Sequence, residues 1–205
     1  MTVDITRWWW VRHAPVTANN GRLYGQRDLP CDTDDTERFD ALAAHLPEDS
    51  VLVTSNLQRT TQTADAISAA GLSMPEPVIE ADLREQSFGD WQGKLYEEIW
   101  PDRDLSGHRL WPAPAHERAP GGESFADLMS RSVPVIARLS EAHRGRDIIA
   151  VTHGGTIRAA IGFALGLDPE SALRLSVENL SVTRLDHVFT PTGIYWRVVN
   201  VNYLP

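Results

Sequence analysis

The chain has 205 residues, of which 42% are hydrophobic and 23% are charged, so we expect residues 1–205 to form a single globular domain. Its formal net charge of -9 argues against nucleic acids and anionic membranes as partners, because both are bound through a basic face. A lone cysteine, Cys31, and the absence of any long apolar stretch exclude an internal disulfide and predict a cytoplasmic protein with no membrane span.

The first predicted element is a strand that ends in two polar side chains. Residues Trp8 to Val11 are aromatic or β-branched, which predicts a strand buried on both faces. Pro15 cannot continue this strand, so Arg12 and His13 are expected at its carboxyl end. Ligands bind at that edge of open α/β sheets. Taken alone, the stretch is equally compatible with a structural strand that ends in polar residues by chance.

The remaining elements alternate between strands and helices along the chain. Short apolar runs predict further strands, which span residues 51–54, 78–79, 147–152, 181–185 and 194–201. Apolar residues at helical spacing predict helices, which span residues 36–46, 57–70, 124–143 and 156–165. Ser55 is the expected N-cap of the second of these helices. This order predicts a three-layer α/β/α sandwich with a mostly parallel central sheet and an antiparallel edge formed by the last two strands.

Residues 86–122 differ from the rest of the chain and are predicted to be an insertion. They hold several prolines and three tryptophans, Trp91, Trp100 and Trp111, and they show little periodicity apart from a short helix expected near Lys94 to Trp100. Long ordered insertions usually serve as lids or binding loops, so a lid-like role is expected here. The alternative is a structural excursion with its own tryptophan cluster.

Three of the predicted strands end close to residues that bind anions. The first ends at Arg12 and His13, the second is soon followed by Arg59, and the third ends at His153 and Gly154. If these strands are parallel neighbours, their carboxyl ends meet at one edge of the sheet. Guanidinium groups and free N–H groups at helix N-termini both bind anions, so the cluster predicts a phosphoryl site. Arg12 and Arg59 would hold the phosphoryl oxygens, and His153 would donate to one of them.

Elimination of other mechanisms leaves an imidazole as the candidate nucleophile. Near these strands there is no metal-binding spacing, no Gly-x-Ser-x-Gly elbow and no Walker motif, so neither a metal nor a cofactor is expected. A cysteine phosphatase would carry an arginine where this chain has Glu37 after Cys31. Histidine is an accepted covalent nucleophile. The leaving alcohol then needs a proton, for which Glu85 is the candidate donor; the alternative is a surface carboxylate paired with Arg84.

Six short motifs follow one another between about residues 8 and 165. They are Arg12-His13; Asn19 with Gly25; Ser55-x-Leu57-x-Arg59-x-x-Gln62-Thr63-Ala64; Leu83-x-Glu85-x-x-Phe88-Gly89-x-Trp91-x-Gly93; Pro120-Gly121-Gly122-Glu123-Ser124; and Thr152-His153-Gly154-Gly155. In order and spacing, this set resembles the histidine phosphatase superfamily. The resemblance implies the phosphoglycerate-mutase-like α/β fold and a phosphohistidine mechanism.

The resemblance also implies roles for individual residues. His13 would be phosphorylated, and Glu85 would act first as an acid and then as a base. The phosphoryl group would be bound by Arg12, Arg59 and His153. The residues expected to line the substrate site are Asn19, Tyr24, Gly25 and Gly154. The partner of the protein would be a small phosphorylated substrate.

Two departures from the family pattern bear on the reaction. The nucleophile is usually followed by Gly-Glu or Gly-Gln, whereas this chain has Ala14-Pro15, and the Arg-His-Tyr-Gly segment of the mutases is absent. Both departures favour a phosphatase, with phosphoglycerate mutase as the alternative. The stretch from Leu23 to Pro30 is similar to alpha-ribazole phosphatase-type members of the family, which makes alpha-ribazole phosphate one expected substrate.

A further alternative is a non-catalytic module that binds phosphorylated ligands or proteins on the same fold. The presence of both His13 and Glu85 argues against it, because a binding module needs neither a nucleophile nor an acid. The sequence is compatible with a monomer or a homodimer.

Overall fold

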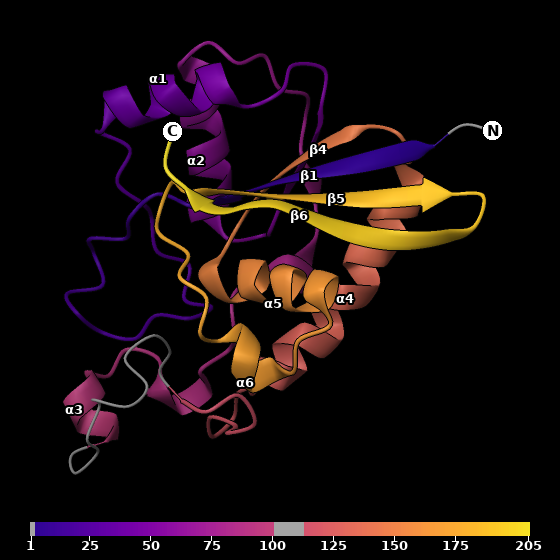
Figure 1. Cartoon of the computed structure of the whole chain (residues 1–205). Helices are drawn as coiled ribbons and strands as arrows, with labels where there is room; N and C mark the ends of the chain where they lie inside the picture. Colours follow the sequence, from indigo (N-terminus) through magenta and orange to yellow (C-terminus); the bar gives the residue numbers. More distant parts are fainter. Residues whose placement is uncertain (1–2, 101–112) are drawn as a thin grey trace.

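The computed structural model describes residues 3–100 and 113–205, and strands alternate with helices along this part of the chain (Figure 1). The strands are β1 (Asp4–Arg12), β2 (Val51–Thr54), β3 (Val78–Ile79), β4 (Asp147–Thr152), β5 (Val182–Thr190) and β6 (Gly193–Tyr203). The helices are α1 (Thr36–His45), α2 (Gln58–Ala69), α3 (Tyr96–Ile99), α4 (Phe125–Ala142), α5 (Gly154–Leu165) and α6 (Pro169–Ala172). Two short 3-10 helices, η1 (Ala81–Leu83) and η2 (Gly89–Trp91), lie between β3 and α3. Among the described residues, no helix is both long enough and apolar enough to cross a membrane.

The strands form one mixed sheet in the order β3-β2-β4-β1-β5-β6. β3, β2, β4 and β1 run parallel, whereas β5 is antiparallel to β1 and β6 is antiparallel to β5. The prediction of a mostly parallel sheet with an antiparallel edge is therefore confirmed. Arg12 of β1 is in register with Thr152 of β4, and Thr54 of β2 is in register with Val151. The carboxyl ends of these three strands thus lie side by side.

Helices cover both faces of the sheet, and a hydrophobic core lies under each layer. In Figure 1, α1 and α2 lie above the sheet, and α4 and α5 lie below it. Side chains alternate between the faces of a strand, so Trp8 and Trp10 of β1 enter one core and Val11 enters the other. The α4 and α5 residues packed with the tryptophans include Ile136, Leu139, Ile157 and Ile161, and the α1 and α2 residues packed with Val11 include Phe39, Leu42, Ala64 and Ile67. Each fully buried aliphatic side chain stabilises the fold by roughly 1.5–3 kcal/mol.

Two helix N-termini differ in how a serine is used, and the one predicted cap, Ser55, is wrong. Ser124 caps α4 in a capping box: its hydroxyl accepts from the Asp127 N–H, and the Asp127 carboxylate accepts from the Ser124 N–H. Ser55 was expected to cap α2, but the N-cap is Leu57, whose side chain makes no capping hydrogen bond, and the Gln58 N–H donates to the Asp28 carboxylate at 2.7 Å. The Ser55 hydroxyl instead lies 2.8 Å from a ring nitrogen of His153, which directs it into the functional cluster.

The predicted insertion, residues 86–122, has its own aromatic cluster. Residues 101–112, which include Trp111, lie outside the described part of the chain. The helix expected near Lys94 to Trp100 is α3. The rings of Trp91 and Trp100 pack edge to face with their centroids 4.9 Å apart. Movement of this segment as a lid stays a prediction.

The two ends of the insertion are joined by backbone contacts. The Ser87 carbonyl accepts from the Glu123 N–H at 2.9 Å, and the Ser87 N–H donates to the Glu123 carboxylate at 2.8 Å. Nearby, Gly89 and Gly122 allow the two backbones to touch, because a Cβ on Gly122 would lie 2.7 Å from the Gly89 nitrogen. The insertion therefore leaves the domain and returns to it at one point.

Candidate active site

Two histidines lie close together at the carboxyl ends of β1 and β4. His13 follows β1 and His153 follows β4, and the His13 N–H donates to the Thr152 carbonyl at 2.9 Å. The centroids of the two imidazole rings are 5.2 Å apart. The exposed fractions of His13 and His153 are 1% and 0%. The alignment of the strand ends thus places both imidazoles in one buried cluster.

The His13 ring adopts a defined tautomer. Its Nδ1 lies 2.7 Å from the Ala14 carbonyl oxygen, which can only accept a hydrogen bond, so Nδ1 carries the hydrogen. Burial, followed by the positive charges of Arg59 and Arg12, holds the pKa of His13 well below its ordinary value, so the ring is neutral at neutral pH. A neutral ring with Nδ1–H has its lone pair on Nε2. Nε2 is therefore the atom that can attack an electrophile.

Two further side chains hold the backbone around His13. The Ala14 N–H donates to the Thr63 hydroxyl at 2.9 Å, and that hydroxyl donates to the Arg59 carbonyl at 2.7 Å. The Asn179 amide donates to the His13 carbonyl at 2.7 Å. Thr63 belongs to one of the sequence motifs but carries no predicted role, and Asn179 belongs to none. Together they fix the predicted nucleophile, His13, before any substrate binds.

Arg12 lies against the N-terminus of α5. Its Nη1 donates to the Val177 carbonyl at 2.6 Å, and its buried Nε has no acceptor among the described residues. α5 begins at Gly154, two residues before its predicted start, and a Cβ at this glycine would lie 3.5 Å from the Arg12 Nε. A buried N–H without an acceptor costs free energy until a ligand accepts from it. The Arg12 Nε and the adjacent helix N-terminus therefore offer donors to an anion.

Arg59 is fully buried, and its guanidinium group is held by three acceptors. Nη2 donates to the Gly25 carbonyl at 2.7 Å, and Nη1 donates to the Arg27 carbonyl at 2.9 Å. Nε donates to the His153 Nδ1 at 3.3 Å. Burial lowers the pKa of Arg59, and the Glu85 carboxylate opposes this shift, so Arg59 stays a cation at neutral pH. Arg59, which is predicted to bind the phosphoryl group, is therefore a cation that is held in position before any substrate binds.

Three of the residues expected to line the substrate site come from the loop after β1. The Tyr24 ring lies over Arg59, with its centroid 5.1 Å from the guanidinium carbon. Gly25, whose carbonyl holds Arg59, has a φ of 47°, and a Cβ there would meet backbone and side-chain atoms of the insertion within 2.8 Å. The Asn19 amide donates to the Arg22 carbonyl at 3.1 Å and closes its own turn. The structure brings Tyr24 and Gly25 to Arg59, and contact between Asn19 and substrate stays a prediction.

Glu85 follows η1 and contacts the N-terminus of α5. Its two carboxylate oxygens lie 3.2 Å and 3.3 Å from the Gly155 nitrogen, and one of them accepts from the Gln86 N–H at 2.9 Å. The residue is only 8% exposed, so it is not the exposed carboxylate of the alternative interpretation. A negative group at a helix N-terminus is stabilised by the helix dipole. Proton donation by Glu85 stays a prediction.

Arg131 of α4 clamps the backbone that carries Glu85. Its guanidinium group donates to the carbonyls of Asp82, Arg84 and Glu85 at 2.6 Å, 2.9 Å and 2.9 Å. It also donates twice to the Glu123 carboxylate, at 2.7 Å and 3.0 Å. The sequence does not indicate this role, because main-chain acceptors leave no residue pattern. Charge-assisted hydrogen bonds of this kind fix the Glu85 backbone relative to α4.

Both ring nitrogens of His153 have partners within the protein. Nδ1 lies 3.3 Å from the Arg59 Nε, and Nε2 lies 2.8 Å from the Ser55 hydroxyl oxygen. Burial, followed by the charge of Arg59, holds the pKa of His153 well below its ordinary value. Donation from His153 to a phosphoryl oxygen stays a prediction, because it requires one of these partners to be exchanged.

The gathered groups suit phosphoryl chemistry. They supply an imidazole lone pair, guanidinium donors, a helix N-terminus and a carboxylate, which can attack a phosphoryl group, hold its oxygens and transfer a proton. Within residues 3–100 and 113–205, no three histidine, cysteine, aspartate or glutamate side chains gather as a metal ion would require.

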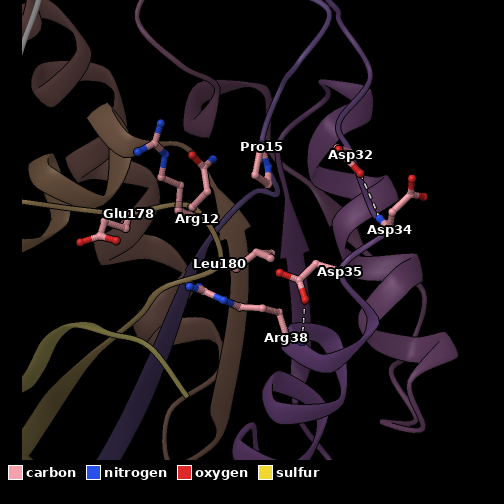
Figure 2. A pocket seen from close by; sticks show the side chains of 9 residues that line it. Arg12, Pro15, Asp32, Asp34, Asp35, Arg38, Glu178 and Leu180 are labelled. Atoms are coloured by element: carbon pink, nitrogen blue, oxygen red, sulfur yellow. Dashed lines mark hydrogen bonds between the residues drawn. The ribbon is translucent and has the colours of Figure 1, made fainter.

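A pocket of about 690 Å³ lies beside the end of β1 and the loop that follows it (Figure 2). Its lining residues are Arg12, Pro15, Asp32, Asp34, Asp35, Arg38, Glu178, Asn179 and Leu180. Figure 2 shows Asp32, Asp34 and Asp35 on one side and Glu178 on the other. Carboxylates on two sides repel a phosphoryl group, and Arg12 is the only member of the predicted catalytic set in this lining. The pocket therefore borders the predicted catalytic cluster, and its carboxylates do not favour the binding of a phosphoryl group.

Comparisons with known proteins agree with this geometry. The sequence model of the histidine phosphatase superfamily (branch 1) matches residues 8–202. Glucosyl-3-phosphoglycerate phosphatase of Mycolicibacterium vanbaalenii is 35% identical over 171 residues, which cover 77% of this chain and 73% of that protein. A Yersinia enterocolitica protein named "probable phosphoglycerate mutase" is 29% identical over 185 residues, which cover 88% of this chain and 85% of that protein. A solved mycobacterial glucosyl-3-phosphoglycerate phosphatase superposes with a TM-score of 0.80 at 29% identity, covering 97% of this chain and 99% of that chain.

Proposed function

Because the chain belongs to the histidine phosphatase superfamily, we propose that it is a metal-independent phosphomonoesterase that acts on a small phosphorylated metabolite through a phosphohistidine. The observation that carries this proposal is the tautomer of His13, which leaves the Nε2 lone pair in the field of Arg12 and Arg59. Relatives that are named phosphatases support the same reaction class.

The proposed reaction has two steps. In the first, the His13 Nε2 attacks phosphorus, the bond to the leaving oxygen breaks, and Glu85 gives a proton to the leaving alcohol. Arg12 and Arg59 donate to the phosphoryl oxygens and stabilise the charge that develops on them. In the second, Glu85 takes a proton from water while the water oxygen attacks the phosphohistidine. Inorganic phosphate leaves, and the neutral His13 ring is restored.

Two metabolites are the first candidates for the substrate. Glucosyl-3-phosphoglycerate is favoured by the relative that shares 35% identity over 77% of this chain. Alpha-ribazole phosphate is favoured by the stretch from Leu23 to Pro30, which places Tyr24 over Arg59. The insertion, residues 86–122, packs against this same loop and is expected to decide between them.

The purified protein is expected to release phosphate from at least one phosphorylated metabolite in the presence of excess chelator. The proposed steps use only side chains and water, so removal of metal ions leaves them intact. Phosphate release is measured with and without EDTA from both candidate substrates, 3-phosphoglycerate and p-nitrophenyl phosphate. Equal rates support the proposal. Activity that EDTA abolishes and zinc or magnesium restores contradicts the metal-independent mechanism.

The same panel tests the alternative function, a phosphoglycerate mutase; several relatives are named "probable phosphoglycerate mutase". A mutase must retain its intermediate and exclude water from the phosphohistidine. Here the nucleophile is followed by Ala14 and the exposed Pro15, which provide no polar side chain to retain an intermediate. We therefore expect hydrolysis to be the faster reaction. Conversion of 3- to 2-phosphoglycerate that outpaces hydrolysis of every ester would assign the protein to the mutases.

The variant Arg59→Lys is expected to lose transition-state stabilisation although it keeps the positive charge. Lysine lacks the planar fork that contacts Gly25, Arg27 and His153 at once, so it cannot hold two phosphoryl oxygens in the same way. The expected loss of transition-state stabilisation, obtained from the ratio of the two kcat/KM values, is about 2 kcal/mol, judged from charge-assisted hydrogen bonds and oxyanion donors. Arg144→Lys, at an exposed ion pair with Asp4, is the matched control and should keep its activity. A near-normal kcat/KM for Arg59→Lys would place Arg59 outside the reaction.

A further inference from the structure

A continuous line of buried hydrogen bonds runs from Arg59 through His153 to Ser55. The Arg59 Nε is 3.3 Å from the His153 Nδ1, and the His153 Nε2 is 2.8 Å from the Ser55 hydroxyl oxygen. All three residues have an exposed fraction of 0%. Ser55 was expected to cap α2 and does not, so its side chain is free for this contact.

The direction of these hydrogen bonds follows from the chemistry of the groups. A guanidinium N–H can only donate, so the His153 Nδ1 must accept and cannot carry a hydrogen. The low pKa of His153, caused first by burial and then by the charge of Arg59, keeps the ring neutral. A neutral imidazole has one N–H, which must therefore be Nε2–H. The acceptor of that hydrogen is the Ser55 oxygen.

The surroundings of Ser55 fit this acceptor role. Its oxygen also accepts from the Leu57 N–H at 3.2 Å and lies 3.2 Å from the Thr60 hydroxyl oxygen. Thr60 donates to the Leu57 carbonyl at 2.8 Å, so the Thr60 oxygen is available to accept the hydrogen of Ser55. The Ser55 hydroxyl thus accepts from His153 and Leu57 and donates to Thr60. Every hydrogen of the line is assigned.

We propose that Ser55 is a positioning residue of the active site, which fixes His153 as the Nε2–H tautomer and so presents the Nδ1 lone pair to Arg59. The inference rests on the proposed function, in which Arg59 binds the phosphoryl group. Ser55 touches no reacting atom; it acts through His153 and Arg59. Without its oxygen, the buried Nε2–H loses its acceptor, so the Nε2–H form, which Arg59 still favours, loses part of its stability relative to the Nδ1–H form. In the Nδ1–H form, the His153 and Arg59 donors face each other, and Arg59 loses one of the three acceptors that orient its guanidinium group.

The first test reads the tautomer in the resting protein. Protein labelled with ¹⁵N at the histidine rings is compared as wild type, Ser55→Ala and Thr61→Val by NMR at neutral pH. Thr61 is the matched control, because it is a hydroxyl residue of α2 that donates to the Gln58 carbonyl at 2.9 Å, outside this line. His153 should be the neutral Nε2–H tautomer in the wild type and in Thr61→Val. In Ser55→Ala, the signals should move towards the Nδ1–H form.

The second test measures kcat and KM for the best substrate of the panel. Ser55→Ala is expected to lower kcat/KM by about tenfold to hundredfold, the scale of one buried hydrogen bond left without its partner. Thr61→Val should stay close to the wild type.

Wild-type His153 found as Nδ1–H, or as a cation at neutral pH, overturns the proposal. So does a Ser55→Ala variant with an unchanged tautomer. The NMR measurement needs no turnover, so it stands even if the protein proves not to be a phosphatase.

Discussion

Replacing His13 with alanine is expected to abolish the phosphoenzyme and to lower kcat/KM by roughly 10⁴-fold or more, the scale of losing a covalent nucleophile. The reason is geometric. The Ala14 carbonyl takes the Nδ1–H, burial and two arginines keep the ring neutral, and the lone pair on Nε2 has no counterpart in alanine. The measurement is an acid quench of enzyme mixed with substrate labelled in the phosphoryl group. The label on the wild type should be lost in acid and kept in alkali, as phosphohistidine is.

A second histidine provides the control for this experiment. His143 lies just beyond the end of α4, close to the amino end of β4 and therefore at the opposite edge of the sheet from His13. His143→Ala should form the labelled intermediate at the wild-type level. Label that survives acid would point to a serine or threonine ester. Label retained by His13→Ala would show that another residue is the nucleophile.

Replacing Glu85 with glutamine is expected to slow phosphoenzyme formation from an alkyl phosphate by roughly 10²-fold or more, the usual scale of general acid catalysis. An alkoxide is a poor leaving group and needs the proton, whereas p-nitrophenolate hardly needs it. Single-turnover bursts with both esters isolate the first step, so the loss should be much smaller with p-nitrophenyl phosphate. The isolation matters because Glu85 would also act as the base in the second step, which both substrates share.

Glu85 also has a structural role, and the experiment must separate the loss of that role from the loss of proton donation. The carboxylate accepts from the Gly155 and Gln86 N–H groups, and the amide oxygen of glutamine can still accept there. The fold around α5 should therefore survive, and unchanged thermal unfolding checks this point. Equal slowing with both leaving groups would mean that Glu85 supports the site and donates no proton.

The convergence of Arg12, His13 and His153 could be predicted because it depends on one local rule. Each follows or ends a short apolar run, and parallel neighbours expose such residues at a common edge. The register of Arg12 with Thr152 confirms the pairing on which that expectation depended. Arg59 and Glu85 joined the predicted site through sequence motifs that resemble those of the histidine phosphatase superfamily.

The supporting contacts could not be predicted, because they join residues that are distant in sequence through groups that leave no pattern. Asn179 reaches the His13 carbonyl from the other end of the chain, and Arg131 reaches main-chain carbonyls before the insertion. Ser55 shows the opposite difficulty. A serine before a helix is typical of an N-cap, and only the position of His153 reveals that its hydroxyl has another partner.

The bridge between Ser87 and Glu123 holds the two ends of the insertion together independently of what lies between them. Its two ends are already held together, and Arg131 fixes Glu85 outside the exchanged region through the same Glu123 carboxylate. Closing a flexible loop costs only about 0.6 kcal/mol more for each doubling of its length. Segments of different length are therefore expected to replace residues 88–122 without displacing Glu85, the predicted proton donor. Gly25, whose carbonyl holds Arg59, lies against Phe88 and Gln92. An exchange that keeps these two contacts is therefore expected to vary the accepted alcohol and to leave the proposed chemical step untouched.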